Sequence, residues 1–493
     1  MSTCLFFNPY LFQQSAVSGI AQWATRISGG TTVGYSIIFD SSGNSYVTGT
    51  YTSTATIYNS NGTTFGTLTT AGGNDVIIVK YNTSGTAQWA THIGGIGSDV
   101  GYGIAADSSG NSYVTGGYVS TTLTIYNSNG TTFGTLTGAG VTQDVFIVKY
   151  NTSGTAQWAT RLSGAGTEIG YGIATDSSGN SYITGVYGSN PLTIYNSNGT
   201  TFGTLTIAGG TDVFIVKYNT SGAAQWATRL SGTANDQGQG IAIDSSGNSY
   251  ITGFYVSNPL TIYNSNGTTF GTLTGTGTNN DVFIVKYDTS GAAQWATRLS
   301  GTSADVGYGI AADSSGNSYI TGSYSSNPLT IYNSNGTIFS NLTGTSTTTD
   351  VFIVKYNTSG AAQWATRVLG TGNDAGYGIS VDSSGNSSIT GQYGSNPLTI
   401  YHSNGTIFSN LTNAGSTDVF IVNYNTSGTA QWATRVAGTA SDQGQGIAVD
   451  SSSLYVTGQY TSNPLTIYHS NGSTFGTLTG TGTTSDVFIV KYI

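Results

Sequence analysis

The chain has 493 residues, of which 37% are hydrophobic, 12% aromatic and only 7% charged, and its formal net charge is -9. This hydrophobic content is too high for a disordered protein, so we expect a folded one. The 12 Lys and Arg residues are spread evenly, which argues against nucleic acid or an anionic membrane surface as partner, because both need clustered positive charge. A single cysteine, Cys4, excludes a disulfide within the chain.

Residues 1–20 do not resemble the rest of the chain. The stretch MSTCLFFNPYLFQQ has a short apolar cluster but lacks the basic n-region and the long apolar h-region of a standard signal peptide. No run in the chain approaches the ~18 apolar residues of a membrane span, so we expect no membrane insertion. We interpret residues 1–20 as an N-terminal extension.

From residue 21 onward one unit recurs. Tryptophan occurs only inside the motif AQWAT, at intervals of 66 to 69 residues: Trp23, Trp89, Trp158, Trp226, Trp295, Trp364 and Trp432. This period indicates one structural unit repeated seven times. Within a unit, four runs rich in β-branched and aromatic residues predict strands, and DSSGN, NTSG and Gly-rich turns bound them; examples are residues 144–150, 156–162, 172–176 and 181–187.

An additional hairpin is predicted in each unit between the run SYITGVY, at residues 181–187, and the following DVFIVKY, at residues 212–218. In LTIYNSNGTTFGTLT, residues 192–206, the pair Asn198 and Gly199 suits a two-residue type I′ turn. That turn would place Tyr195 opposite Phe202 as an aromatic cross-strand pair. Each unit is therefore expected to contain four strands plus one hairpin.

Four-stranded antiparallel units in seven copies predict an all-β, seven-bladed β-propeller, because a closed ring of sheets leaves little exposed edge. The last unit stops after DVFIVKY at residues 486–492, and an unaccompanied AQWATRI stands at residues 21–27. Pairing these two segments would close the ring, whereas an open solenoid would need capping repeats. We therefore predict one propeller domain over residues 21–493, with strand 21–27 completing the last blade.

The units resemble a known repeat. GIAxDSSGNSYxTG, DVFIVKYNTSG and AQWATR are similar to the SBBP (seven-bladed β-propeller) repeat family, in which a DxxGNxYVTG stretch is followed by DAFVxKY and a Trp. The resemblance covers roughly residues 21–493 and implies the propeller fold. It implies no catalytic residues. The last unit departs from the pattern with DSSSLY at residues 450–455, so its turn should be shorter or differently shaped.

Charged residues fall into repeated columns. All six Lys occupy the VKY position and all six Arg the WATR position, and 20 of the 21 acids fall into three columns. A glycosidase needs two carboxylates in different environments, which equivalent copies do not supply. His92, His402, His469 and Cys4 are scattered and form neither a nucleophilic triad nor a zinc site. We therefore expect no enzyme, no metal site and no cofactor.

Two of the columns predict local structure. Asp144 and Arg161 are placed symmetrically about the NTSG turn at residues 151–154, so a tight turn would pair them across two strands, and the other units repeat the arrangement. DSSGN lacks the alternating acids of a calcium loop and is better explained as an Asx turn with Gly.

The third column is the candidate ligand or cation site. It contains the acids that precede the innermost strand: Asp99, Glu168, Asp236, Asp305, Asp374 and Asp442, with Thr32 in the seventh place. In a propeller they should lie near the axis, on the same face as the added hairpins. A ring of acids at a channel mouth could hold a cation or a polyhydroxylated ligand, although the same acids could simply cap turns.

These observations favour a non-enzymatic propeller that acts as a binding or structural surface component of a cell envelope or virus particle. The expected partner is a protein or glycan surface, and the expected location is extracellular, at a cell surface or in a virus particle, without a standard signal peptide. The alternative is a lectin-like multivalent glycan-binding module with sugar sites between the hairpins, where exposed Tyr would stack on sugar rings.

Overall fold

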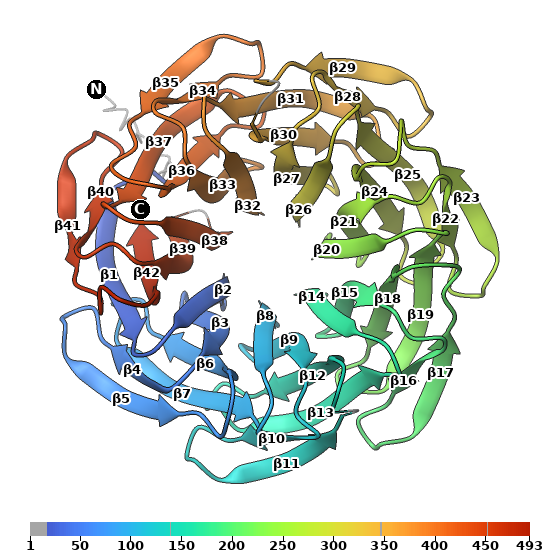
Figure 1. Ribbon diagram of the computed structural model, residues 1–493, viewed down its shortest axis with the longest axis horizontal. Helices are drawn as coiled ribbons and strands as arrows, with labels where there is room; N and C mark the ends of the chain where they lie inside the picture. The colour runs from blue at the N-terminus through green and yellow to red at the C-terminus, as the bar shows by residue number, and fades with distance from the viewer. Residues whose placement is uncertain (1–16, 139, 346–347, 451) are drawn as a thin grey trace, which may run out of the picture.

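The computed structural model describes residues 17–138, 140–345, 348–450 and 452–493. Seven antiparallel sheets stand around a central axis, each running radially from the axis to the perimeter, as Figure 1 shows. No helix occurs within these described residues. The predicted all-β, seven-bladed propeller is confirmed, although each sheet has six strands rather than four.

The three inner positions of the sheets are taken by short strands in the same order. The innermost strands are β2 (Thr32–Phe39), β8 (Asp99–Ala106), β14 (Glu168–Thr175), β20 (Asp236–Ile243), β26 (Asp305–Ala312), β32 (Asp374–Val381) and β38 (Asp442–Val449). The second strands are β3 (Ser45–Tyr51), β9 (Ser112–Tyr118), β15 (Ser181–Tyr187), β21 (Ser249–Tyr255), β27 (Ser318–Tyr324), β33 (Ser387–Tyr393) and β39 (Leu454–Tyr460). The third strands are β6 (Asp75–Tyr81), β12 (Asp144–Tyr150), β18 (Asp212–Tyr218), β24 (Asp281–Tyr287), β30 (Asp350–Tyr356), β36 (Asp418–Tyr424) and β42 (Asp486–Tyr492).

The three outer positions follow the same rule. The fourth strands carry the AQWAT motif: β1 (Ala21–Ser28), β7 (Ala87–Gly94), β13 (Ala156–Ser163), β19 (Ala224–Ser231), β25 (Ala293–Ser300), β31 (Ala362–Leu369) and β37 (Ala430–Ala437). The fifth strands are β4 (Thr54–Tyr58), β10 (Thr122–Tyr126), β16 (Leu192–Tyr195), β22 (Leu260–Tyr263), β28 (Leu329–Tyr332), β34 (Leu398–Tyr401) and β40 (Leu465–Tyr468). The edge strands, at the perimeter, are β5 (Thr64–Thr69), β11 (Thr132–Thr137), β17 (Thr201–Leu205), β23 (Thr269–Leu273), β29 (Ile338–Leu342), β35 (Ile407–Leu411) and β41 (Thr474–Leu478).

The fifth and edge strands of a blade come from the following unit of the sequence. The blade that begins with β2 has the order β2-β3-β6-β7-β10-β11, so its outer hairpin β10–β11 is donated by the unit that builds the next blade from β8 and β9. Numbering this blade as blade 1, the innermost strands β2 to β38 define blades 1 to 7. Each unit thus contributes strands to two neighbouring blades. The two blades are therefore linked both by the continuous chain and by strand pairing in the sheet that the hairpin joins.

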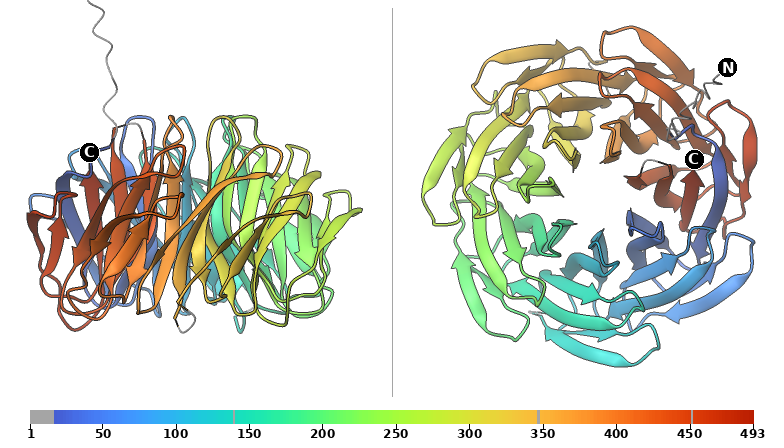
Figure 2. Two further views of the ribbon diagram at one scale, coloured as in Figure 1. Left: turned by 90° about the horizontal axis from the view of Figure 1, so that it is seen from above. Right: turned by 180° about the vertical axis from the view of Figure 1, so that it is seen from behind.

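The hairpins do not stand on the face that the sequence indicated. Each one leaves the face where the acids lie, runs along the outside of the preceding blade and turns at the opposite face; Figure 2 shows strands crossing the outside of the ring from one face to the other. Its tip there meets the NTSG turn of the next blade: the Ser60 amide donates to the Gly85 carbonyl at 2.9 Å. We call this side, with the DSSGN and NTSG turns and the hairpin tips, the turn face, and the other the acid face.

The predicted conformation of the hairpin turn is wrong. A type I′ turn needs positive φ at both central residues, but within the described residues positive φ occurs only at glycines, such as Gly199 at 82°. The amide of Gly199 donates to the Asn196 carbonyl, and the amide of Asn196 to the Thr200 carbonyl. Tyr195 consequently lies opposite Thr201 rather than Phe202, and Phe202 becomes the extra residue of a β-bulge.

The third strand of each blade explains why the motif DVFIVKY has no polar alternation. In β12 every residue is buried, because neighbouring blades cover both faces of the sheet at this radius. The fourth strand, nearer the perimeter, alternates: Gln157 is exposed while Ala156 and Trp158 are buried. Seven clusters of buried side chains fill the spaces between adjacent blades, one at each junction.

The ring closes as predicted, through pairing of β1 with β42 in blade 7. The register joins Ala21 to Tyr492 and Ile27 to Val487, and Figure 1 shows the first strand beside the last. Residues 17–20, read above as part of the extension, belong to the fold. Their Val-Ser-Gly sequence takes the place of the Thr-Ser-Gly of an NTSG turn, with the Trp432 indole donating to the Val17 carbonyl at 2.7 Å. The rest of the predicted extension, residues 1–16, lies outside the described residues.

Removing residues 1–28 should leave the buried edge of β42 without a partner and expose it to association with other chains. We expect the truncated protein to form oligomers or aggregates and to melt well below the parent, as followed by light scattering after gel filtration and by circular dichroism. Removing only residues 1–16 is the control, because it leaves β1 and residues 17–20 in place. A monomeric 1–28 deletion with the parent melting temperature would contradict closure through β1.

Candidate functional site

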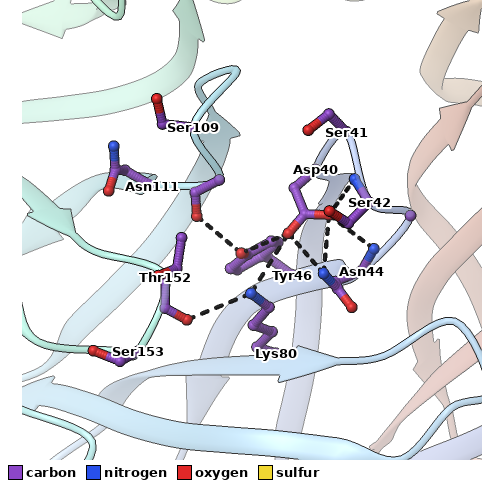
Figure 3. Close-up of polar contacts among 12 residues, drawn as sticks. Asp40, Ser41, Ser42, Asn44, Tyr46, Lys80, Ser109, Asn111, Thr152 and Ser153 are labelled. Atoms are coloured by element: carbon purple, nitrogen blue, oxygen red, sulfur yellow. Dashed lines mark hydrogen bonds and ion pairs between the residues drawn. The ribbon is translucent and has the colours of Figure 1, made fainter.

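The DSSGN acids organise the turn face. Figure 3 shows Asp40, whose carboxylate accepts hydrogen bonds from the amides of Ser42 and Asn44 and from the hydroxyl of Tyr46 at 3.0 Å. The Lys80 ammonium lies 3.5 Å from the same carboxylate. These bonds hold the pKa of Asp40 below its usual value despite the cost of burial. The Asx-turn reading of DSSGN therefore agrees with the geometry. In the last unit the shorter turn is confirmed, since the Asp450 amide donates to the carbonyl of Ser453, three residues along the chain, whereas the Asp40 amide donates to that of Asn44, four residues along.

The same cluster joins one blade to the next. The Tyr46 hydroxyl of blade 1 also lies 2.9 Å from the Gly110 carbonyl of blade 2, so its one proton is shared between that carbonyl and the Asp40 carboxylate. Both Lys80 and the Trp89 indole donate to the carbonyl of Thr152, in the NTSG turn of blade 2. The Lys column, the Trp column and the DSSGN acids thus serve blade-to-blade contacts.

The predicted register of Asp directly opposite Arg is wrong, although the arginine charge still acts on the acid: burial raises the pKa of Asp212, and Arg229 opposes that rise. Arg161 lies opposite Phe146, two residues further along than Asp144. The NTSG loop closes with a bond from the Asn151 amide to the Thr155 carbonyl, which leaves three residues in the turn rather than two. A bulge follows at Gln157, so the register shifts by two residues in all. The ion pairs found among the described residues instead join lysines to DSSGN acids: Lys80 to Asp40, Lys149 to Asp107, Lys217 to Asp176 and Lys286 to Asp244.

The arginines stack on tyrosines. The Arg229 guanidinium lies 4.1 Å from the ring centre of Tyr263, on the neighbouring fifth strand. Five more arginines repeat this contact, and His92, which replaces Arg in one unit, stacks on Tyr126 at 4.2 Å. The cation–π contact attaches the added hairpin to the AQWAT strand.

The hairpin tips fasten adjacent blades. The Asn196 side-chain oxygen accepts from the Ala224 amide at 2.9 Å, which caps the first amide of β19 in the next blade. The Ser197 hydroxyl donates to the Ser221 carbonyl of the same blade. His402 and His469 replace this Asn in two units, and each accepts the equivalent amide through Nδ1. We call this contact the tip clasp.

The clasp predicts different outcomes for two substitutions at one position. Asn196→Leu should leave the Ala224 amide without an acceptor and cost about 1 to 2 kcal/mol locally. Asn196→His should cost little, because His402 and His469 already perform this function. Hydrogen exchange at the Ala224 amide measures the difference. Equal exchange in the two variants would contradict the clasp.

The six candidate acids are buried rather than displayed at the channel mouth. Asp99, Glu168, Asp236, Asp305, Asp374 and Asp442 are each 0% exposed. The Asp305 carboxylate accepts from the amides of Ser325 and Ser326 and from the Ser326 hydroxyl at 2.7 Å. Thr32, in the seventh place, also points inward and bonds to the Ile27 carbonyl. These acids cap the loop between the second and fifth strands. Within the described residues, no three His, Cys, Asp or Glu side chains gather in a way that could hold a metal ion.

Burial changes the protonation of these acids. It raises the pKa of Asp236 to about 6 and that of Asp305, Asp374 and Asp442 to about 7, and the pKa of Glu168 also rises to about 7. The serine bonds oppose the shift. A second acid at the start of the third strand of the preceding blade adds to it, as Asp281 does for Asp305.

The raised pKa values predict a stability that falls as pH rises. The folded chain holds these protons more tightly than the unfolded chain, so the stabilisation is complete below about pH 4 and is lost as pH rises through about 7. His92 acts in the opposite sense, since burial lowers its pKa to about 4, but it is a single group. We expect a higher melting temperature at about pH 5.5 than at about pH 8. Replacing Asp305, Asp374 and Asp442 with Asn should reduce that difference, and a melting temperature that rises over this range would contradict the assignment.

The axial wall carries tyrosines at a bulge in the innermost strand. Tyr35, Tyr102 and Tyr171 lie in sequence around the axis, with neighbouring ring centres 5.1 Å apart, and Tyr308 and Tyr377 form a second group. Glutamines take the equivalent position in blades 4 and 7, which breaks the sevenfold repeat: Gln239 and Gln445.

The perimeter carries repeated grooves. Five grooves of 750 to 910 Å³ lie between the edge strand of one blade and the hairpin tip of the next. One wall of each has the sequence Phe-Gly-Thr-Leu, as at residues 202–205. Asn264 to Gly267 of the next tip form the opposite wall, and Gln225 and Arg229 line the space between.

Each groove has a phenylalanine at its rim. The seven edge-strand phenylalanines all sit at the bulge, and six are 37% to 42% exposed: Phe65, Phe133, Phe202, Phe270, Phe339 and Phe475. The seventh, Phe408, is half-buried beside His402. The sequence showed that the motif TTFGT repeats, but not that its phenylalanine is exposed. The bulge directs the phenylalanine ring outward, and the bulge cannot be recognised in the sequence.

Comparison with known proteins agrees with the fold. A family model described as a β-propeller repeat, SBBP, matches residues 22–52, 88–116, 157–186, 225–253 and 294–329. An uncharacterized WD repeat-containing protein, L264, of Acanthamoeba polyphaga mimivirus is 32% identical over 513 residues, covering 91% of this chain. The chain spans only 37% of the length of that relative.

Solved structures similar to this chain include virginiamycin B lyase from Staphylococcus aureus and the Dos1 propeller. Both are 9% identical to this chain. The lyase match covers 95% of this chain and 98% of the lyase, with a TM-score of 0.33. The Dos1 match covers 96% of this chain and 95% of the Dos1 chain, with a TM-score of 0.40. Among the described residues, no helix has the length and apolar character to cross a membrane. The family model thus identifies five SBBP β-propeller repeats in this chain, within the ring of seven blades that the structure shows.

Proposed function

We propose that this protein is a non-enzymatic binding module that acts through its perimeter, as a surface component of a cell envelope or virus particle. The observation that carries the proposal is the division of the repeated residues into two sets. The Lys, Trp, Asn and DSSGN columns are used in contacts between blades. The edge-strand phenylalanines are repeated as faithfully, yet six of them remain substantially exposed.

An exposed aromatic ring that recurs on successive blades has no comparable structural use. Scattered exposed apolar residues are ordinary, but a repeated set beside grooves is typical of a binding surface. The charge distribution is compatible with this, since the acids of the repeats lie mostly inside the ring, and the charged side chains that line the grooves are lysines and arginines.

The equivalence of the blades supports binding over catalysis. Acid–base catalysis needs groups whose environments differ, so that one holds a proton that the other lacks. Here the acids of each column have the same partners from blade to blade, as the Ser326 and Ser395 hydroxyls show for Asp305 and Asp374. Equivalent weak sites are instead suited to a repetitive target, where several contacts form at once.

The similarity to a mimivirus protein supports the virus-particle form of the proposal. The lectin-like alternative is a narrower form of the same function, because it assigns a ligand to the same perimeter.

The perimeter can be tested with a matched pair of charged variants. The first replaces Phe65, Phe133, Phe202, Phe270 and Phe475 with Glu. The control places the same five charges on exposed serines of the turn face: Ser42, Ser109, Ser178, Ser246 and Ser315. We expect the parent and the control to co-sediment with envelope or particle fractions of the source, and the Phe→Glu variant to lose at least about tenfold in retention. Retention that fails only in the serine variant would move the functional surface to the turn face.

A further inference from the structure

We infer that each perimeter groove binds a pyranose ring of a glycan, with the ring lying against the bulged phenylalanine. This inference rests on the proposed function and names the ligand class for the same surface. A sugar ring has an apolar face of C–H groups and an edge of hydroxyls, so its site needs an aromatic surface next to hydrogen-bonding groups.

The groove supplies the aromatic surface. Phe202 is 41% exposed and is the unpaired residue of the bulge between β16 and β17. A bulge turns a side chain out of the regular alternation, and bulges are frequent beside binding sites. The sequence-based alternative assigned this function to tyrosine, but Tyr195 is held under the Arg161 guanidinium at 4.1 Å. Phenylalanine is the aromatic residue available to a ligand.

The groove also supplies polar groups and space. Gln225 is exposed in the groove, and its Nε2 donates to the Ala223 carbonyl, which fixes the amide in place. Thr204 and Asn266 are exposed on the two walls. A volume of 750 to 910 Å³ lies in the range of small-ligand sites.

The charge of the side chains that line the grooves restricts the class of ligand. All five grooves contain a lysine, four contain an arginine, and no Asp or Glu side chain lines any of them. A cationic ligand is therefore disfavoured. A neutral pyranose or one bearing a carboxylate is compatible, and both share the ring that the phenylalanine contacts. A peptide strand added to the edge strand is less suitable, because the bulge interrupts the ladder of hydrogen bonds.

One position in the groove allows it to be filled without disturbing the fold. A Cβ atom built on Gly203 meets no atom within 4 Å, and the same holds for the four equivalent glycines, Gly66, Gly134, Gly271 and Gly476. All five line the grooves, and none has the positive φ that would strain a side chain. Replacing these five glycines with Ile should block the grooves, and a β-branched residue suits a strand.

The chain itself supplies the control. Two edge strands begin with Ile rather than Thr, and Ile338 and Ile407 are each 59% exposed. Replacing Thr64, Thr132, Thr201, Thr269 and Thr474 with Ile places the same side chain two residues from each glycine, at positions that do not line the grooves. Both variants should keep the parent melting temperature, which separates loss of binding from loss of fold.

The experiment measures retention of the full chain on immobilised dextran, mannan, galactan, chitin and polygalacturonate, with poly(vinyl alcohol) as a hydroxylated polymer without rings. We expect the parent and the Thr→Ile control to bind at least one pyranose polymer, and the Gly→Ile variant to lose binding by at least about tenfold. The matching methyl pyranoside should compete only at ~mM concentration and should change the tryptophan fluorescence, because each groove is lined by a tryptophan. Preference for polygalacturonate over the neutral polymers would assign the arginine to a sugar carboxylate.

Absence of binding to every pyranose polymer, or equal binding by the Gly→Ile variant, would overturn the inference. Its failure can be distinguished from failure of the proposed function by periodate treatment of the envelope or particle fraction. Retention that needs the five phenylalanines but survives periodate would keep the perimeter as the binding surface and remove the glycan.

Discussion

The structure depends on the contact between neighbouring blades. A single sheet of this protein has apolar side chains on both faces of its third strand, as in the fully buried β12, and can cover neither by itself. Only a closed ring gives each sheet two neighbours. The polar columns reinforce the same contact: Tyr46, Lys80 and Trp89 of one blade all bond to carbonyl groups of the next. Few carboxylates are therefore left for the outer surface, and recognition at the perimeter has to rely on aromatic, neutral polar and basic groups.

The repeat, the positions of the strands and the closing pair could be predicted from the sequence, because each depends on periodic composition. The pairing of Asp144 with Arg161 could not, because it required the number of residues in a turn to be known. A glycine with positive φ at Gly154 and a bulge at Gln157 each shift the register, and neither changes the hydrophobic pattern. The sequence also did not show that the hairpin of each unit joins the preceding blade. By composition, strand 192–195 fits the edge of its own blade and the edge of the preceding blade equally well.

The candidate site was predicted less well than the fold. The acids were chosen as the candidate site because charged residues are rare in this chain. Rarity does not show that an acid is exposed, and Asp305 is buried in the loop that it caps. Repetition alone does not separate residues that hold blades together from residues that face a ligand. Exposure does, and it distinguishes Trp226, at 7%, from Phe202, at 41%, although both recur with the same period.

The closing pair of strands has a mechanical consequence. In β1 and β42 the first residue of one strand lies beside the last residue of the other, as Ala21 does beside Tyr492. Tension applied to the two ends of the ring would therefore break these hydrogen bonds one after another, by unzipping, instead of loading them all together in shear. Anchored through one end, the ring bears no such load; held at both ends, it would open at blade 7 before any other blade is strained.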